Sequence, residues 1–256
     1  MINIRSNDNF KSPWIVGHRG YCARFPENTL IAFEAAASAG ATMIELDAML
    51  SRDRRVVVIH DTNLDRTSNG RGNVADKTLQ ELKRLDAGSW FDTQFAGQQI
   101  PALSEVLDLL GRRIYINIEL KSNAYESHHP ADAIERQVVE MLRQKNLLDV
   151  SLVSSFEVNF LEQIAAMEHR PAIAFISEKP ADPNTIRMCR RLNVFSWHPD
   201  YRIISQSQVQ KMQDAGLKVF PYTVNTRADG VKMSGLGVDG IITDDPELAG
   251  RWINAV

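Results

Sequence analysis

The chain has 256 residues, 44% of them apolar and 24% charged, as is ordinary for a globular protein of one or two domains. The net charge of −3 gives no reason to expect a nucleic-acid partner, and two cysteines are too few for a disulfide framework. The first ten residues show no apolar leader, and no run approaches the roughly 18 apolar residues of a spanning helix. We therefore expect a cytoplasmic protein without a transmembrane segment.

Eight apolar, strand-like runs alternate with helical patterns along the chain. The runs are residues 14–18, 43–50, 114–120, 151–155, 172–177, 194–198, 218–224 and 239–243. The first helical stripe begins after Asn28, a possible N-cap, and ends at Gly40. Repeated strand–helix units imply a parallel sheet, and eight of them predict an α/β fold of the (β/α)8 barrel type.

One further strand-like run, residues 56–60, follows the second strand after only five residues. A parallel crossover needs about a dozen residues or more, so this run predicts an antiparallel hairpin on the second strand. The hairpin is expected above the barrel mouth as an extension of the second strand, and residues 62 to about 100 then form an insertion. We expect a single barrel domain over residues 1–256, with hairpin and insertion together at about 49–100.

Carboxylates gather on the inward faces of two predicted strands. Because strand faces alternate, Glu45 and Asp47 point into the barrel from one strand, and Glu119 and Lys121 from the next. Three inward carboxylates repel one another unless a cation lies among them, and Mg²⁺ or Ca²⁺ prefers such oxygen ligands. The alternative is that these carboxylates pair with Arg19, Lys121 and other cations, and spacing alone does not decide between the two.

Two histidines, His18 and His60, each follow an apolar run at an end that faces the predicted mouth. A histidine of near-neutral pKa can accept or donate a proton during displacement at phosphorus. Arg19 and Lys121 can bind phosphate oxygens. Cys22 follows His18 in the same loop, but it has no identifiable base and is not expected to be catalytic. The combination indicates metal-assisted cleavage of a phosphate ester.

At these residues the sequence resembles the glycerophosphodiester phosphodiesterase family, and most closely its cytosolic bacterial members. The motifs that carry the resemblance span nearly the whole chain and occur in order. They are His18-Arg19-Gly20, Pro26-Glu27-Asn28-Thr29, Ile44-Glu45-Leu46-Asp47, His60-Asp61 with the following residues to Thr67, Glu119-Leu120-Lys121, Tyr222-Thr223-Val224-Asn225 and residues 237–244.

The resemblance implies a (β/α)8 barrel with a small insertion after the second strand. It implies that a divalent cation is bound by Glu45, Asp47 and Glu119 and that the substrate is a small glycerophosphodiester. It also implies that His18 and His60 are the acid/base pair, and that Arg19 and Lys121 bind phosphate. The products would be an alcohol and sn-glycerol 3-phosphate.

Combining these inferences, we expect a neighbouring glycerol hydroxyl to attack phosphorus and water then to open the cyclic phosphate. His18 would be the first base and His60 the first acid. Two rivals remain open. The same machinery could cleave lysophospholipids if an apolar groove from Trp90, Phe91, Phe156 and Trp197 seats an acyl chain. Alternatively, the protein could bind glycerophosphodiesters without cleaving them.

Two positions depart from the family pattern. The hairpin turn has Arg54 where the family usually has glycine, and a positive φ there would cost roughly 1 kcal/mol, so a different turn type is expected. The late aromatic motif has Tyr222 where tryptophan is usual, which can alter the pocket wall.

Overall fold

Strands and helices alternate through the part of the chain that this computed structural model describes, residues 3–4 and 13–253. The expectation about an amino-terminal leader concerns residues that lie almost entirely outside those ranges. The strands are β1 (Trp14–Gly17), β2 (Met43–Leu50), β3 (Val56–Val58), β4 (Tyr115–Leu120), β5 (Ser151–Ser155), β6 (Ala172–Ser177), β7 (Ser196–Pro199), β8 (Lys218–Val219) and β9 (Gly240–Thr243). The eight predicted barrel strands are thereby confirmed, although β8 has two residues where seven were expected.

The helices are α1 (Leu30–Ser38), α2 (Leu79–Leu82), α3 (Leu103–Leu110), α4 (Ile134–Gln144), α5 (Val158–Ala165), α6 (Pro183–Arg191), α7 (Gln206–Asp214), α8 (Arg227–Gly235) and α9 (Pro246–Ile253). Short 3₁₀ turns lie at Val74–Asp76, Thr93–Phe95 and Ser122–Ala124. Within residues 13–253, none of these helices combines the length and apolar character that crossing a bilayer requires.

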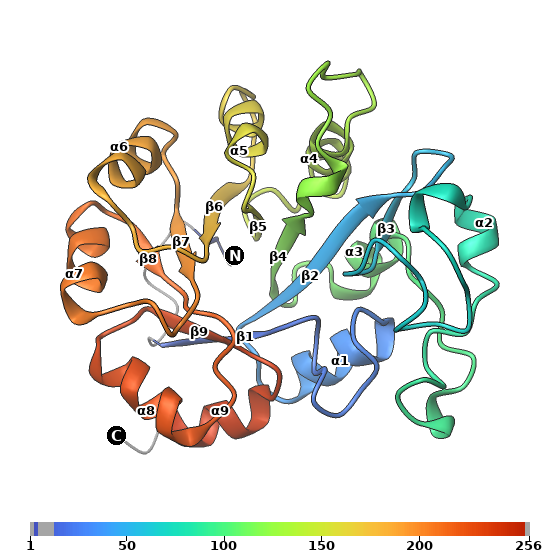
Figure 1. Ribbon diagram of the computed structural model, residues 1–256, viewed down its shortest axis with the longest axis horizontal. Helices are drawn as coiled ribbons and strands as arrows, with labels where there is room; N and C mark the ends of the chain where they lie inside the picture. Colours follow the sequence, from blue (N-terminus) through green and yellow to red (C-terminus); the bar gives the residue numbers. More distant parts are fainter. Residues whose placement is uncertain (1–2, 5–12, 254–256) are drawn as a thin grey trace.

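The parallel strands form a nearly closed barrel in the order β8-β7-β6-β5-β4-β2-β1-β9, with the helices outside it (Figure 1). The remaining gap lies between β8 and β9. Three backbone hydrogen bonds cross it, from Asp239 N to the Val219 carbonyl (3.0 Å), from Ile242 N to the Pro221 carbonyl (2.9 Å) and from Val224 N to the Ile242 carbonyl (2.8 Å). The fold is therefore the predicted (β/α)8 barrel.

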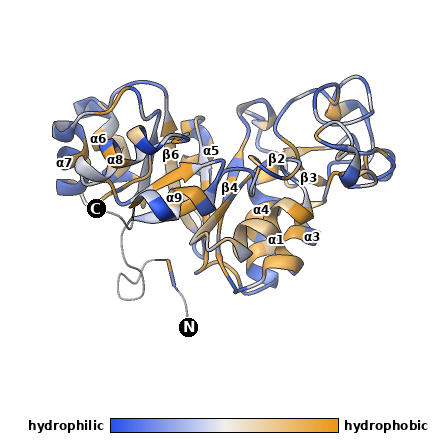
Figure 2. Cartoon of the chain, turned by 90° about the horizontal axis from the view of Figure 1, so that it is seen from below, coloured by the Kyte–Doolittle hydropathy of each residue, from blue (hydrophilic) through white to orange (hydrophobic). Residues whose placement is uncertain are grey.

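Strand alternation decides what faces the helices and what faces the barrel. Ile116, Ile118 and Leu120 of β4 are fully buried on the helix side, where apolar colours dominate helices such as α1 and α3 in Figure 2. On the barrel side, Trp14 stacks on Tyr115 with ring centroids 5.0 Å apart. These rings fill the barrel interior at the amino-terminal ends of β1 and β4, so the polar positions further along the strands are left at the mouth.

The first helix does not begin as expected. Thr29, not Asn28, is its N-cap, and the Thr29 hydroxyl accepts a hydrogen bond from Ala32 N. Asn28 instead has a positive φ of 57° and donates its side-chain amide to Asp47 Oδ2 at 2.8 Å. Asn28 therefore binds the Asp47 carboxylate, although asparagine is a residue type that often caps helices.

The hairpin is confirmed, because β3 pairs antiparallel with β2, with Ala48 opposite Val58. The expectation that its turn would avoid a positive φ is wrong, since Arg54 has a φ of 57°. The Arg54 side chain bonds Glu126 Oε2 through its terminal nitrogen at 2.7 Å and also bonds Asp132. These contacts help to offset the backbone cost and attach the hairpin turn to the segment after β4.

Candidate active site

The predicted site residues meet at a cavity of about 350 Å³ at the carboxyl ends of the barrel strands. Six of the seven line it, namely His18, Arg19, Glu45, His60, Glu119 and Lys121. The seventh, Asp47, is almost fully buried and contacts the Lys121 ammonium. Segments more than a hundred residues apart in sequence therefore converge as predicted.

The three carboxylates lie together because β2 and β4 are paired in parallel, with Asp47 opposite Glu119. Glu45, Asp47 and Glu119 each offer one oxygen, and these oxygens all lie within 4.8 Å of one another. Burial and the charge of Asp47 raise the pKa of Glu45 to about 8. Burial and Asp47 likewise raise the pKa of Glu119, although Lys121 opposes them.

The cations pair with these carboxylates, as the alternative reading of the sequence expected. Lys121 Nζ lies 2.7 Å from Glu119 Oε1 and 3.2 Å from Asp47 Oδ1, and Arg19 Nε lies 3.4 Å from Asp47 Oδ2. Burial alone would raise the pKa of Asp47, but Lys121 and Arg19 hold it well below its usual range. Of the three carboxylates, Asp47 is therefore the one whose negative charge the neighbouring cations balance most fully.

Glu45 remains incompletely satisfied. Its Oε2 accepts a hydrogen bond from Arg19 N at 2.9 Å, but its buried Oε1 has no hydrogen-bond partner among the described residues. A buried carboxylate oxygen without a partner, beside two further carboxylates, is a ligand set that suits a hard divalent cation. The residues present thus fit the ion that the family resemblance implies.

Each histidine is held by a carboxylate. His18 Nδ1 lies 2.6 Å from Asp244 Oδ1, and His60 Nδ1 lies 2.6 Å from Asp61 Oδ1. The pKa values of Asp244 and Asp61 are both lowered to about 2, so both are ionised acceptors and each Nδ1 carries the proton. In the neutral rings the Nε2 atoms then carry no proton and are able to accept one.

The two histidines differ in pKa. Burial disfavours a charge on His18, but Asp244 and Glu45 outweigh it and raise the pKa above 6.5. Burial lowers the pKa of His60, and Arg19 and Lys121 add to that effect against the opposing charge of Asp47. His18 therefore binds a second proton more readily than His60 does.

A charged network joins the phosphate-binding candidate Arg19 to His60. Arg19 bonds Glu27 at 2.9 Å, Arg66 bonds the same carboxylate at 2.7 and 2.8 Å, and Arg66 Nε lies 2.6 Å from Asp61 Oδ2. Glu27, Asp61 and Arg66 all lie in the motifs, but sequence reasoning assigned them no role. The sequence marked these three residues only as members of the motifs. Their ion pairs could not be predicted, because they depend on how the insertion folds.

The aromatic groove expected for an acyl chain is not at this cavity. Of its four residues only Phe156 lines the cavity, where it meets Tyr222 edge to face. Trp197 is fully buried, and its Nε1–H donates to Ser177 Oγ. Trp90 and Phe91 pack on each other within the insertion. The expectation failed because their positions in sequence did not reveal which way they face.

Comparison with known proteins agrees with this geometry. The model of the glycerophosphoryl diester phosphodiesterase family matches residues 18–248. A glycerophosphodiester phosphodiesterase of Caldanaerobacter subterraneus subsp. tengcongensis is 40% identical over 91% of this chain and 94% of its own. One from Bacillus subtilis is 32% identical over 96% of this chain and 89% of its own. A phosphodiesterase structure from Oleispira antarctica, in complex with the product sn-glycerol-3-phosphate, superimposes with a TM-score of 0.87 at 30% identity, covering 94% of this chain and 97% of that one.

Proposed function

The chain belongs to the glycerophosphodiester phosphodiesterase family and is an enzyme of that family, and from this premise we propose how its own residues cleave the substrate. The reaction is hydrolysis of a glycerophosphodiester to an alcohol and sn-glycerol 3-phosphate. The observation that carries the proposal is the convergence of three carboxylates and two carboxylate-bound histidines on one cavity of about 350 Å³. This combination offers a cation site and two proton carriers beside one substrate volume.

Glu45, Asp47 and Glu119 are the residues that would hold the divalent ion. The ion is Mg²⁺ or Ca²⁺, because the donor set consists of carboxylate oxygens alone. When bound, it would supply positive charge to the phosphate and lower the pKa of a glycerol hydroxyl. Arg19 and Lys121, which now pair with Glu119 and Asp47, are the residues that would bind the phosphate oxygens.

The histidines move the protons. In the first step, one histidine accepts the proton of a glycerol hydroxyl as that oxygen bonds to phosphorus. The other donates a proton to the alcohol oxygen as its bond to phosphorus breaks. In the second step water opens the cyclic phosphate with the two roles exchanged, so both histidines return to their starting protonation. Asp244 and Asp61 orient the rings by accepting the Nδ1 protons throughout.

The lysophospholipid rival is disfavoured because Trp90, Phe91 and Trp197 do not line the cavity, although the apolar wall at Phe156 remains. A protein that only binds is disfavoured because binding needs no pair of oriented histidines. The cytoplasmic location expected from the sequence stays a proposal, and cell fractionation would test it.

A product assay separates these possibilities. Glycerophosphocholine, glycerophosphoethanolamine and lysophosphatidylcholine are each incubated with Mg²⁺, Ca²⁺ or chelator, and sn-glycerol 3-phosphate and free alcohol are quantified. We expect ion-dependent turnover of the first two substrates. Turnover only of the lysolipid would favour the first rival, and binding without turnover under every ion condition would favour the second.

A further inference from the structure

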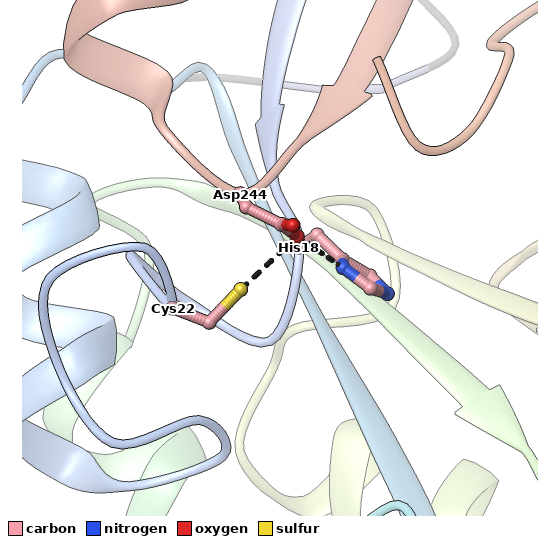
Figure 3. Close-up of side chains that lie close together, drawn as sticks. All are labelled: His18, Cys22 and Asp244. Carbon is pink, nitrogen blue, oxygen red and sulfur yellow. Dashed lines mark hydrogen bonds and ion pairs between the residues drawn. The ribbon is translucent and has the colours of Figure 1, made fainter. Parts of the chain in front are cut away.

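A cysteine lies beside the catalytic candidate His18 without a part in the reaction. Cys22 belongs to the loop between β1 and α1, and its Sγ lies 3.1 Å from Asp244 Oδ1. The same oxygen lies 2.6 Å from His18 Nδ1. Figure 3 shows the thiol and the imidazole reaching this carboxylate from two sides. The second oxygen, Oδ2, accepts a hydrogen bond from Asn225 at 2.6 Å.

The thiol is not placed to act as a nucleophile. Burial and the charge of Asp244 raise the pKa of Cys22, so the sulfur stays protonated at neutral pH. Its contact is with a carboxylate rather than with a base or with the substrate cavity, whose lining includes His18 but not Cys22. The proposed reaction therefore leaves the sulfur unexplained.

The three side chains do form a convergent set of metal ligands. One atom each from His18, Cys22 and Asp244 lies within 4.8 Å of the others. The group is accessible, because the side chains of His18 and Asp244 are 19% and 30% exposed and Cys22 is partly exposed. A sulfur, an imidazole nitrogen and a carboxylate oxygen suit a thiophilic ion such as Zn²⁺, whereas Mg²⁺ and Ca²⁺ prefer oxygen alone.

We propose that His18, Cys22 and Asp244 form a second metal site, which takes Zn²⁺ or a similar thiophilic ion and inhibits the enzyme when filled. The ion replaces the protons that now lie between Asp244 and its two donors. Cys22 releases its thiol proton to solvent. A charged His18 releases its Nδ1 proton to solvent as well, whereas a neutral His18 moves that proton to Nε2. Water completes the coordination. A His18 ring bonded to the ion can no longer exchange protons with substrate, and this inhibitory effect rests on the proposed function.

The first experiment detects the site without measuring activity. The full-length protein is supplied with excess Ca²⁺ to occupy the carboxylate cluster and is then titrated with Co²⁺, a spectroscopic substitute for Zn²⁺. We expect a thiolate-to-cobalt charge-transfer band in the near-ultraviolet. Cys22→Ala should abolish the band and Cys189→Ala, the matched control, should keep it. Absence of the band in the wild-type protein at millimolar cobalt would overturn the proposal.

The second experiment measures inhibition by Zn²⁺ in the presence of the same excess of Ca²⁺. Cys22→Ala should leave turnover without zinc unchanged and raise the half-inhibitory zinc concentration by at least about tenfold, the loss typical of disturbed metal sites. Equal zinc sensitivity in Cys22→Ala and wild type would place the inhibition at the carboxylate cluster. It would overturn the proposal that zinc inhibits through His18, Cys22 and Asp244. A cobalt band with no zinc inhibition would keep the metal site but remove His18 from the proposed reaction.

Discussion

His18 Nδ1 lies 2.6 Å from Asp244 Oδ1, across 226 positions of sequence. The contact exists because β1 and β9 are neighbours in the barrel, with Gly17 opposite Thr243, so the residues that follow the two strands meet at the mouth. The carboxylate holds the ring in one tautomer and favours its charged form. Asp244 is thus a positioning residue for the histidine that we propose as catalytic.

Asp244→Asn tests this role. The neutral amide cannot stabilise a charged His18, so the pKa of His18 should fall. The kcat/KM profile of the wild type should be bell-shaped, with its alkaline limb set by His18 and its acid limb by His60, because the pKa of the first is raised and that of the second lowered. We therefore propose His18 as the first proton donor and His60 as the first acceptor; the assignment expected from the sequence, with His18 as the first base, predicts the two limbs the other way round.

In Asp244→Asn we therefore expect the alkaline limb to move to lower pH and kcat to fall by at least about tenfold. Asp245→Asn changes the adjacent carboxylate, which bonds Leu248 N, and serves as the control. An unshifted alkaline limb in Asp244→Asn would show that Asp244 does not set the charge of His18.

Substitution of the histidines tests proton transfer itself. His18→Ala and His60→Ala should each lose about 10²–10⁴-fold in kcat, the usual contribution of general acid/base catalysis, while the far-ultraviolet spectrum stays unchanged. His128→Ala, on an exposed residue, is the control and should keep full activity. If either active-site variant turned over at the wild-type rate, that histidine would have no part in the mechanism.

Glu119→Gln tests the carboxylate cluster. An ion that binds only the folded state raises the melting temperature, so Ca²⁺ and Mg²⁺ should stabilise the wild type and chelator should remove both the stabilisation and the activity. Glu119→Gln keeps the shape but loses a charged ligand, and the thermal shift should shrink sharply. Glu126→Gln, outside the cluster, should show the same ion-induced thermal shift as the wild type. Full activity after exhaustive chelation would contradict the metal role.

Lys121→Met tests whether this lysine serves the substrate. It removes the charge that lies 2.7 Å from Glu119 while keeping much of the side-chain length. We predict a large fall in kcat/KM with ion affinity little changed, because the phosphate gains charge in the transition state. Lys179→Met is the control. Collapse of ion affinity with intact kinetic parameters would instead make Lys121 a structural counter-charge.

His198 predicts a specific loss of stability in acid. It is 1% exposed, and burial lowers its pKa to about 3 from 6.5. Between about pH 3 and pH 6.5, His198 therefore carries a proton in the unfolded chain but not in the folded chain. Stability falls as pH falls through that window, by about 1.4 kcal/mol per pH unit.

Between pH 7 and 5 the His198 contribution amounts to about 2 kcal/mol of unfolding free energy. His198→Gln removes the titrating group, so urea denaturation at the two pH values should show a smaller acid loss in the variant. The comparison is between pH differences, which cancels any constant cost of the substitution. An equal acid loss in both proteins would show that folding does not lower the pKa of His198.

The barrel and the carboxylate cluster could be predicted because both depend on local alternation. In β4, Ile116 and Ile118 face the helices while Asn117 and Glu119 face the cavity, a pattern that the sequence displays directly. The pairing of β2 with β4 follows because they belong to consecutive strand–helix units of the barrel. The carboxylate partners of the histidines were harder, because a loop residue such as Asp244 has no periodicity to show where it points.

The Asn28 and Arg54 interpretations failed for a related reason. Asn28 has the chemistry of a cap, but Asp47, which lies 19 positions later, binds its amide. Arg54 takes a conformation that glycine adopts more easily, because acidic partners 72 and 78 positions away hold its side chain. In each case a long-range contact outweighed a local preference.

The link from Arg66 through Glu27 to Arg19 bears on how this enzyme can be re-engineered. Arg66 lies in the insertion, yet it bonds the carboxylates that hold both Arg19 and His60. Trimming residues 62–100 to obtain a minimal barrel would keep every expected cation ligand but would remove Arg66, and with it the contacts that hold Asp61 beside His60 and Glu27 beside Arg19. The insertion therefore supports the arrangement of the site, and a chimaera should exchange the two as one unit.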